Sequence, residues 1–247
     1  IDKLEKGGIA VEYQLHAVSY LLPRVLFKST PELFLSDENG CKNREFNCCP
    51  SSEKALEIIE KNAKKLAFLL KQKTSRYHLW ADDDLGADIR CKCEKCKDLS
   101  AFGQNSIICE AITRGLKKYD GKAENALLLY GEEREFYGAP QNAFIEFAPF
   151  KRDHAIPVTD GEKNAFFADK LKRLISLYGA EKVSVLEYFL SYDFNDFLRG
   201  DGASRVEKDV EFYINAGVTD LTTFAVFAGA STEEKLDGIK KYFKILG

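Results

Sequence analysis

The sequence predicts an α/β fold, a (β/α) TIM-type barrel, and two observations predict it. Short apolar runs of strand length alternate along the chain with longer segments whose apolar residues recur every three or four positions. Such an alternation of strands and helices is typical of a parallel sheet with helices outside it. Six strands are expected, whereas a closed barrel has eight, so we expect the first one or two β/α units to be missing before Ile1.

Length and composition fit one globular domain over residues 1–247 and argue against several classes of function. The net charge of −3 does not favour nucleic acid as a partner. No apolar run approaches the roughly 20 residues that span a bilayer, so no membrane partner is expected. The seven cysteines, an odd number, favour a reducing, cytoplasmic location over a disulfide framework. Because the chain begins at Ile1 and contains no methionine, we expect it to be a fragment of a longer product.

Elements of the first half are predicted from periodicity and capping residues. Residues 9–16 alternate polar and apolar side chains, as a strand with one polar face does. Residues 21–49 have no sustained period, so we expect a long loop there. The helix that begins after Ser52 carries an apolar stripe as far as Leu70, and hydroxyl groups can cap its start. The next expected elements are a buried strand at 77–81 and a helix at 105–119.

The second half repeats the same alternation of strand and helix. We expect strands at 126–130, 142–148, 183–190 and 221–227, and helices at 162–178, 206–216 and 231–243. Pro149 ends one of these strands, and Gly217 stops the second of the three helices. Ser231 and Glu234 have the spacing of a capping box, which predicts the start of the last helix.

Three cysteines, Cys91, Cys93 and Cys96, fall within six positions, a density that suits thiolate ligation of a single metal ion. They belong to a cysteine-containing loop insertion that we expect around residues 36–50 and 82–100. A structural zinc site needs four ligands, so a fourth ligand must come from elsewhere. We interpret the cluster as a zinc site. The alternative is a group of reduced thiols that are merely neighbours.

Several segments resemble the bacterial domain of unknown function 4838 family: NCCPSSEKAL, LWADDD followed by CKCEKCKDLS, FIEFAPFKRD, and VLEYFL. The resemblance spans nearly the whole chain. It implies a barrel similar to those of glycoside hydrolases, found among bacterial carbohydrate-processing proteins, and it implies no particular reaction. It also pairs the NCCPSS loop with the CxCxxC motif, which makes Cys49 or Cys48 the candidate for the fourth zinc ligand.

Four acidic residues are candidates for glycosidic bond hydrolysis, which needs two carboxyl groups that flank one bond. Asp82 and Asp83 follow the strand at 77–81, and Glu146 and Glu187 lie within otherwise apolar strands. We predict Asp82 or Asp83 as the general acid, Glu187 as the nucleophile or base, and Glu146 as an assisting group. The alternative is that these acids form structural ion pairs or cap helices.

The expected ligand is a carbohydrate, because aromatic rings can stack on sugars while acidic and basic groups bind the sugar hydroxyls. The candidate substrate-binding residues lie at or near expected strand ends: His16, Trp80, Tyr130, Arg152 and Tyr188. A different class of function also fits the sequence. In that alternative the chain is a non-catalytic carbohydrate-binding or scaffolding barrel with a structural zinc site.

Overall fold

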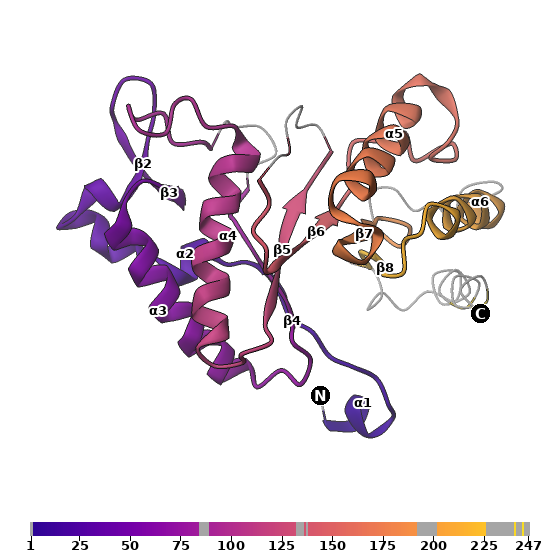
Figure 1. Ribbon diagram of the computed structural model, residues 1–247, viewed down its shortest axis with the longest axis horizontal. Coiled ribbons are helices and arrows are strands. Elements are labelled where there is room, and N and C mark those ends of the chain that lie inside the picture. The colour runs from indigo at the N-terminus through magenta and orange to yellow at the C-terminus, as the bar shows by residue number, and fades with distance from the viewer. Residues whose placement is uncertain are drawn as a thin grey trace. The chain divides into compact units, whose positions relative to one another are not determined.

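The computed structural model describes residues 2–83, 89–131, 136, 138–191, 202–225, 240 and 244. Contacts divide the chain into two compact units, which are described separately. Unit 1 comprises Ile1–Leu128 and Glu133–Phe144, and unit 2 comprises Leu129–Glu132 and Ile145–Gly247. In Figure 1 the colours of unit 1 run from indigo to magenta, and the later part of unit 2 is orange to yellow. Among the described residues, no helix is both long enough and apolar enough to cross a membrane.

The main sheet is open, and the predicted TIM-type barrel is therefore wrong. Its strands follow the order β1 (Gln14–His16), β4 (Arg76–Trp80), β5 (Glu124–Leu129), β6 (Ala143–Phe147), β7 (Val183–Glu187) and β8 (Leu221–Thr223). The registers described for this sheet are all parallel. Among the described residues, β1 and β8 stand at opposite ends of this order, so the strands do not close. Closure into this kind of barrel takes eight strands, and the sheet has six.

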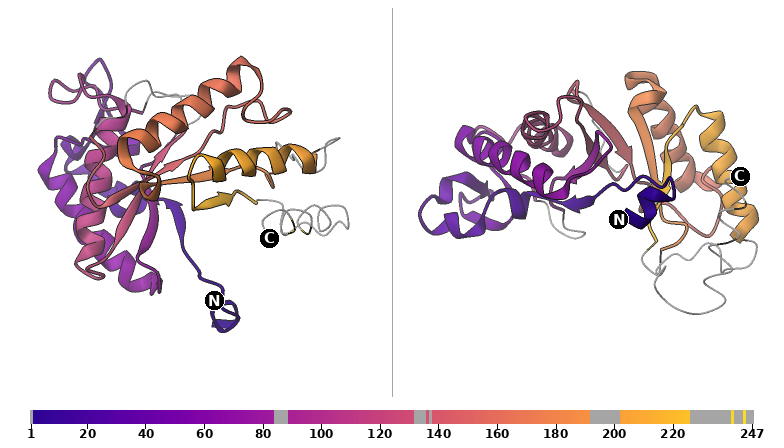
Figure 2. Two further views of the ribbon diagram at one scale, coloured as in Figure 1. Left: turned by 45° about the vertical axis from the view of Figure 1, so that its right-hand side comes forward. Right: turned by 90° about the horizontal axis from the view of Figure 1, so that it is seen from below.

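Unit 1 is built on two helices, α3 (Glu53–Leu70) and α4 (Ala101–Lys117), which lie side by side (Figure 1; Figure 2). Each begins at a serine whose Oγ accepts a hydrogen bond from a backbone N–H, Ser52 for α3 and Ser100 for α4. The apolar faces of both helices share a core with Tyr77 and Leu79 of β4. Because side chains alternate along a strand, the neighbouring residues of β4 point to the other face of the sheet.

Helices α3 and α4 lie in close contact at Gly115 of α4. A Cβ atom at this position would lie 2.2 Å from the carbonyl oxygen of Glu60 and 2.8 Å from the Cβ of Ala63, both in α3. We therefore expect Gly115→Ala to lower the free energy of unfolding by about 2–4 kcal/mol, because backbone atoms must move to make room. Gly121→Ala is the control, since nothing lies within 4 Å of its added Cβ. Equal urea midpoints for the two variants would contradict this close approach.

A short antiparallel hairpin occupies part of the segment expected to be a long loop. It pairs β2 (Phe34–Ser36) with β3 (Lys42–Cys48). Asp37 forms the turn, because its Oδ1 accepts hydrogen bonds from the backbone N–H groups of Asn39, at 2.8 Å, and Cys41, at 2.9 Å. The short elements α2 (Val18–Leu21), η1 (Arg24–Lys28) and η2 (Pro31–Leu33) precede the hairpin, and α1 (Asp2–Lys6) precedes β1. Most of these elements are too short to produce a detectable period in the sequence.

Unit 2 combines β7 and β8 with α5 (Gly161–Tyr178), η3 (Ala180–Lys182) and α6 (Gly202–Asn215). Phe147 of β6 points towards the helices, because it and Phe167 of α5 both border Gly131. Val185 is the register partner of Phe147, so Val185 and Glu187, two residues further along β7, also face the helices. The helix predicted at 231–243 lies outside the described residues, apart from Lys240.

Candidate functional site

Four cysteine sulfurs gather in unit 1. The Sγ atoms of Cys49, Cys91, Cys93 and Cys96 all lie within 4.8 Å of one another. The Cys49 sulfur is 3.8 Å from that of Cys93 and 3.8 Å from that of Cys96. Four sulfurs in a tetrahedron, each about 2.3 Å from one ion, are about 3.8 Å apart. The predicted grouping is therefore confirmed, and the four residues lie close enough to bind one metal ion.

Residues 90–97, which carry Cys91, Cys93 and Cys96 and are called the cysteine segment, are held by α4 and by the hairpin. Gln104 in the first turn of α4 donates from Nε2 to the carbonyl oxygens of Cys91, at 2.9 Å, and Cys96, at 3.1 Å. Its Oε1 accepts from the backbone N–H of Cys91 at 2.8 Å. The backbone N–H of Ser36 in β2 lies 3.4 Å from the Cys91 sulfur. These buried contacts fix the backbone on both sides of Cys91 and the position of its sulfur, so the ligands are held in place.

The structure distinguishes Cys49 from Cys48, which the sequence left as alternatives. Successive residues at the end of β3 point in opposite directions, so Cys49 joins the sulfur cluster while Cys48 enters the hydrophobic core beneath α3. Burial raises the pKa of the Cys48 thiol to about 12. Burial also raises the pKa of Cys109 in α4, to about 11. Cys41 is exposed and lies outside the cluster.

Protons are distributed unevenly among the four thiols. A hydrogen bond from Cys49, helped by backbone N–H groups of Cys93 and Ser36, lowers the pKa of Cys91 to about 4. The same hydrogen bond, with burial, raises the pKa of Cys49, and burial raises that of Cys96. At neutral pH the cluster therefore contains one thiolate stabilised by its neighbours and at least two protonated thiols. A metal ion would displace those protons.

We therefore expect metal affinity to rise with pH. Because at least Cys49 and Cys96 must each lose a proton, the logarithm of the association constant should rise by about two or more for each pH unit below their raised pKa values. Competition with a chelator of known proton affinity, repeated from mildly acidic to neutral pH, measures this slope. An affinity that does not change over that range would contradict the thiol assignment.

Asp82 is a structural anchor at the end of β4. Its Oδ2 is 2.8 Å from Nη2 of Arg24 in η1, and its Oδ1 accepts from the N–H and hydroxyl of Ser19. Asn47 of β3 accepts from the backbone N–H of Asp82 at 2.7 Å and donates from Nδ2 to the Asp82 carbonyl oxygen at 2.9 Å. Burial raises the pKa of Asp82 despite the attraction of Arg24, and burial also lowers the pKa of Arg24. This ion pair therefore joins β4 to the segment around η1.

Removing the Asp82 charge should destabilise unit 1. Asp82→Asn leaves the partly buried Arg24 guanidinium without this ion-pair partner, so we expect the free energy of unfolding to fall by about 2–3 kcal/mol. Asp169→Asn, an exposed residue on α5, is the control with the same change in charge and shape. Urea denaturation measures both variants. A change at Asp82 no larger than that at Asp169 would show that the pair is not a structural anchor.

His16 and Asp83 form the more accessible polar pair. His16 ends β1, next to Trp80 at the end of β4, and its Nε2 lies 3.3 Å from Oδ1 of Asp83. Its Nδ1 is 2.7 Å from the carbonyl oxygen of Ala81, so Nδ1 carries a proton and donates it. The imidazole ring is 5.2 Å from the Trp80 ring, and both side chains of the pair are 33% exposed. Two predicted binding residues and one predicted catalytic acid therefore meet in unit 1.

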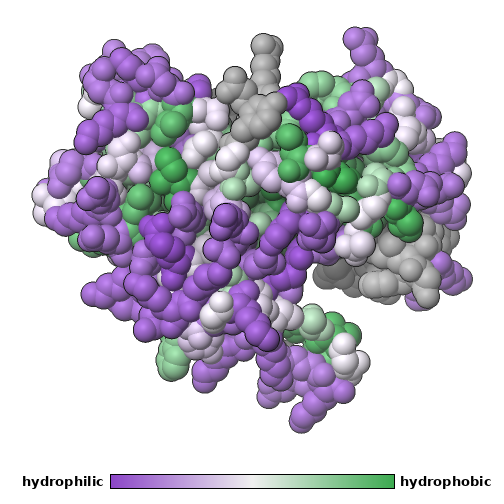
Figure 3. Space-filling view, in the orientation of Figure 1, coloured by the Kyte–Doolittle hydropathy of each residue, from purple (hydrophilic) through white to green (hydrophobic). Residues whose placement is uncertain are grey.

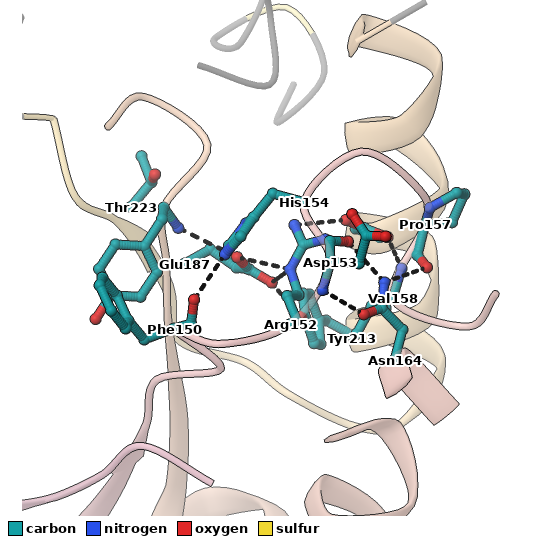
Figure 4. A network of polar contacts seen from close by, with 12 residues as sticks. Phe150, Arg152, Asp153, His154, Pro157, Val158, Asn164, Glu187, Tyr213 and Thr223 are labelled. Atoms are coloured by element: carbon teal, nitrogen blue, oxygen red, sulfur yellow. Dashed lines mark hydrogen bonds and ion pairs between the residues drawn. The ribbon is translucent and has the colours of Figure 1, made fainter. Parts of the chain in front are cut away.

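Glu187 lies within a buried network of unit 2 (Figure 4). Arg152, in the loop after β6, donates from Nε to Oε1 of Glu187 at 3.1 Å and pairs through Nη2 with Asp209 of α6 at 3.1 Å. Tyr213, one turn after Asp209, donates its hydroxyl to Glu187. Burial, followed by the charge of Glu187, raises the pKa of Tyr213 well above its usual value. The Glu187 side chain has no exposed surface.

The loop that carries Arg152 is fixed to α5 and α6. The backbone N–H of Val158 donates to Oδ1 of Asp209 at 2.6 Å (Figure 4). Asn164 of α5 accepts from the N–H of Asp153 at 2.6 Å and donates to the carbonyl oxygens of Asp153 and Pro157. Arg152 and Glu187 thus form a buried structural ion pair, although the sequence predicts substrate-facing roles for them.

Of the remaining predicted residues of unit 2, Glu146 lies on β6, and Tyr130 and Tyr188 lie in a row of aromatic rings. Glu146 is 1% exposed on β6, and its register partner is Ser184. Tyr130 and Tyr188 belong to a row of rings in the order Tyr130, Phe150, Tyr188 and Phe224, with centroids 6.2, 5.1 and 5.9 Å apart. Phe150 and Phe224 are not among the site residues predicted from the sequence. Their signal is their position, because each follows the end of a strand by one to three residues.

The predicted site residues therefore fall into two groups, each within its own unit. Unit 1 holds Asp82, Asp83, His16, Trp80 and the four cysteines, and unit 2 holds Glu187, Arg152, Tyr130, Tyr188 and Glu146. Comparisons with protein-family models, with curated proteins and with solved structures gave no match. The resemblance to the domain of unknown function 4838 family stays an expectation.

Proposed function

We propose that unit 1 binds one Zn²⁺ ion through the thiolates of Cys49, Cys91, Cys93 and Cys96, and that the ion has a structural role. The observation that carries this proposal is the spacing of the four sulfurs, which all lie within 4.8 Å of one another, with two separations of 3.8 Å that match a tetrahedral zinc site. Zinc prefers such all-sulfur tetrahedral sites, and four protein ligands leave no open position for a substrate. The ion would join the end of the hairpin to the segment before α4, where apolar contacts are few.

Metal content measured by mass spectrometry of the purified protein tests this proposal. We expect one equivalent of zinc in the wild type and in Cys41→Ser, whose thiol is exposed and outside the cluster. Cys93→Ser should lose the zinc, because serine replaces one of the four ligands. Cys48→Ala should keep it. Zinc retained by Cys93→Ser, or absent from the wild type, would contradict the assignment.

As a second function we propose saccharide binding by the aromatic row of unit 2. The row of Tyr130, Phe150, Tyr188 and Phe224 follows the carboxyl ends of four successive strands, and Phe224 is 40% exposed. Ligands of open α/β sheets bind at the carboxyl ends of the strands, and sugars stack on aromatic rings. Saturation-transfer NMR with a panel of oligosaccharides tests the proposal. Binding should be weaker in Phe224→Ala and unchanged in Phe166→Ala, an exposed phenylalanine on α5.

The ion pairs favour binding without hydrolysis. Asp82 is paired with Arg24, and Glu187 is enclosed by Arg152 and Tyr213, so neither carboxyl group faces solvent as a reacting group would. We therefore favour the non-catalytic alternative and keep hydrolysis as the rival proposal. A panel of aryl glycosides separates the two. If the wild type turns over a glycoside and Glu187→Gln does not, while circular dichroism shows an intact fold, the result would support hydrolysis instead of binding alone.

A further inference from the structure

A cavity of about 420 Å³ lies in unit 1 beside the hairpin. Its polar lining is cationic on two sides: Lys42 and Arg44 come from β3, and Arg90 and Lys92 come from the cysteine segment. The volume falls in the range of small-molecule sites, about 300–1,000 Å³. Neither the metal centre nor the aromatic row uses this cavity.

The cavity carries an excess of positive charge. Among its described lining residues, two acids, Asp37 and Glu45, accompany the four cations, and four minus two leaves a charge of +2. The whole chain has a charge of −3, so the cavity is opposite in sign to the rest of the protein. Asp37 already accepts two backbone hydrogen bonds in the hairpin turn. An anion entering the cavity would therefore meet a positive potential.

The cations could bind a ligand at little cost. Arg44 pairs with Glu45 at 3.0 Å, and Lys92 pairs with Glu38 at 3.2 Å, but the acids of these pairs are 66% and 72% exposed. Exposed ion pairs contribute roughly 0–1 kcal/mol, so an anion can replace the carboxylate in each. Lys42 donates from Nζ to the carbonyl oxygen of Phe34 at 3.1 Å, which orients its ammonium group.

The two sides of the cavity, the hairpin and the cysteine segment, are joined by a backbone hydrogen bond. The backbone N–H of Lys92 donates to the carbonyl oxygen of Ser36 at 2.7 Å, so the cysteine segment is bonded to β2. Between Arg90 and Lys92, Cys91 points into the sulfur cluster. In Figure 3 the surface over the end of the hairpin, at the upper left, is mostly hydrophilic. The hydrogen bond between Lys92 and Ser36 therefore keeps the cations of the two segments close to one another.

We propose that this cavity binds a small organic phosphate or sulfate ester. Arginine and lysine are suited to oxyanions, and a guanidinium can donate two parallel hydrogen bonds to one such group. Phe27 and Leu35 also line the cavity and offer apolar contact to the organic part of the ester. The ligand class therefore combines an oxyanion head, bound by Arg44 and its neighbours, with a short apolar or cyclic body.

Isothermal titration calorimetry of the protein as purified tests this proposal with phenyl phosphate, phenyl sulfate, phenol and inorganic phosphate. We expect at least one of the two esters to bind, phenol not to bind, and inorganic phosphate to bind more weakly because it lacks the apolar body. Arg44→Ala and Lys42→Ala should each weaken ester binding about tenfold, the effect of one charge-assisted hydrogen bond. Lys64→Ala, on the exposed face of α3, is the matched control.

Three outcomes would overturn the proposal. They are failure of both esters to bind, inorganic phosphate binding as tightly as the esters, and equal affinity in Arg44→Ala, Lys42→Ala and the control. Circular dichroism of each variant separates loss of the site from loss of the fold. Added salt should weaken ester binding, because the cavity is open to screening ions.

Discussion

Cys96→Ser is expected to lose the bound metal and to lower the free energy of unfolding of unit 1 by at least about 3 kcal/mol, because structural zinc contributes its binding energy directly to folding. The core around the cluster explains the size of this effect. Of the described residues, Leu35, Phe46 and the cysteines form the apolar cluster there, so the proposed ion would add a strong link between the hairpin and the segment before α4. Differential scanning calorimetry, with and without a strong chelator, measures the loss.

The chelator provides the internal comparison for Cys96→Ser. Chelation of the wild type should reproduce the lower stability of the variant, and the variant itself should no longer respond to the chelator. Cys41→Ser, an exposed cysteine outside the cluster, should behave as the wild type in both conditions. A chelator that leaves the wild-type melting temperature unchanged would contradict a structural role for metal.

Glu187→Ala is the second large expected loss, about 3–5 kcal/mol in the free energy of unfolding of unit 2, since it breaks a buried ion pair and leaves two buried donors, Arg152 Nε and the Tyr213 hydroxyl, without their acceptor. Arg152 would retain its ion pair with Asp209 but lose the one with Glu187. Because Arg152 also orders the loop before α5, the loop should become more susceptible to proteolysis. Urea denaturation and limited proteolysis measure the two effects.

Two further variants distinguish the contribution of the ion pair to stability from that of the surrounding side-chain packing. Glu211→Gln removes an exposed carboxylate from α6 and should change stability by less than about 0.5 kcal/mol. The double variant Glu187→Gln with Arg152→Met removes both charges, so its loss should be smaller than the sum of the two single losses. Additive losses would mean that the two side chains do not act as a pair.

Much of the secondary structure could be predicted because it depends on local signals. The apolar stripe and serine cap of α3, and the strand Arg76–Trp80, follow from periodicity in the sequence. The sulfur cluster was also predictable, because three of its ligands are close in sequence. Closure of the sheet was not, since strand periodicity carries no information about which strands become neighbours. The hairpin was missed because β2 has only three residues.

The ion-pair partners of the acidic residues could not be predicted because they are distant in sequence. Asp82 is paired with Arg24, 58 positions away, and Glu187 with Arg152, 35 positions away. A carboxylate at a strand end looks the same in the sequence whether it faces a ligand or a buried guanidinium. Gln104, which holds the cysteine segment, was missed for the same reason: it is a polar residue on an amphipathic helix.

Zinc K-edge X-ray absorption spectroscopy of the purified protein tests the central claim most directly. Four thiolates around one ion predict a single shell of sulfur scatterers at about 2.3 Å and no nitrogen or oxygen shell. Cys41→Ser should give the same spectrum, because its thiol lies outside the cluster. A shell of nitrogen or oxygen ligands at about 2.0–2.1 Å, or zinc well below one equivalent, would contradict the account.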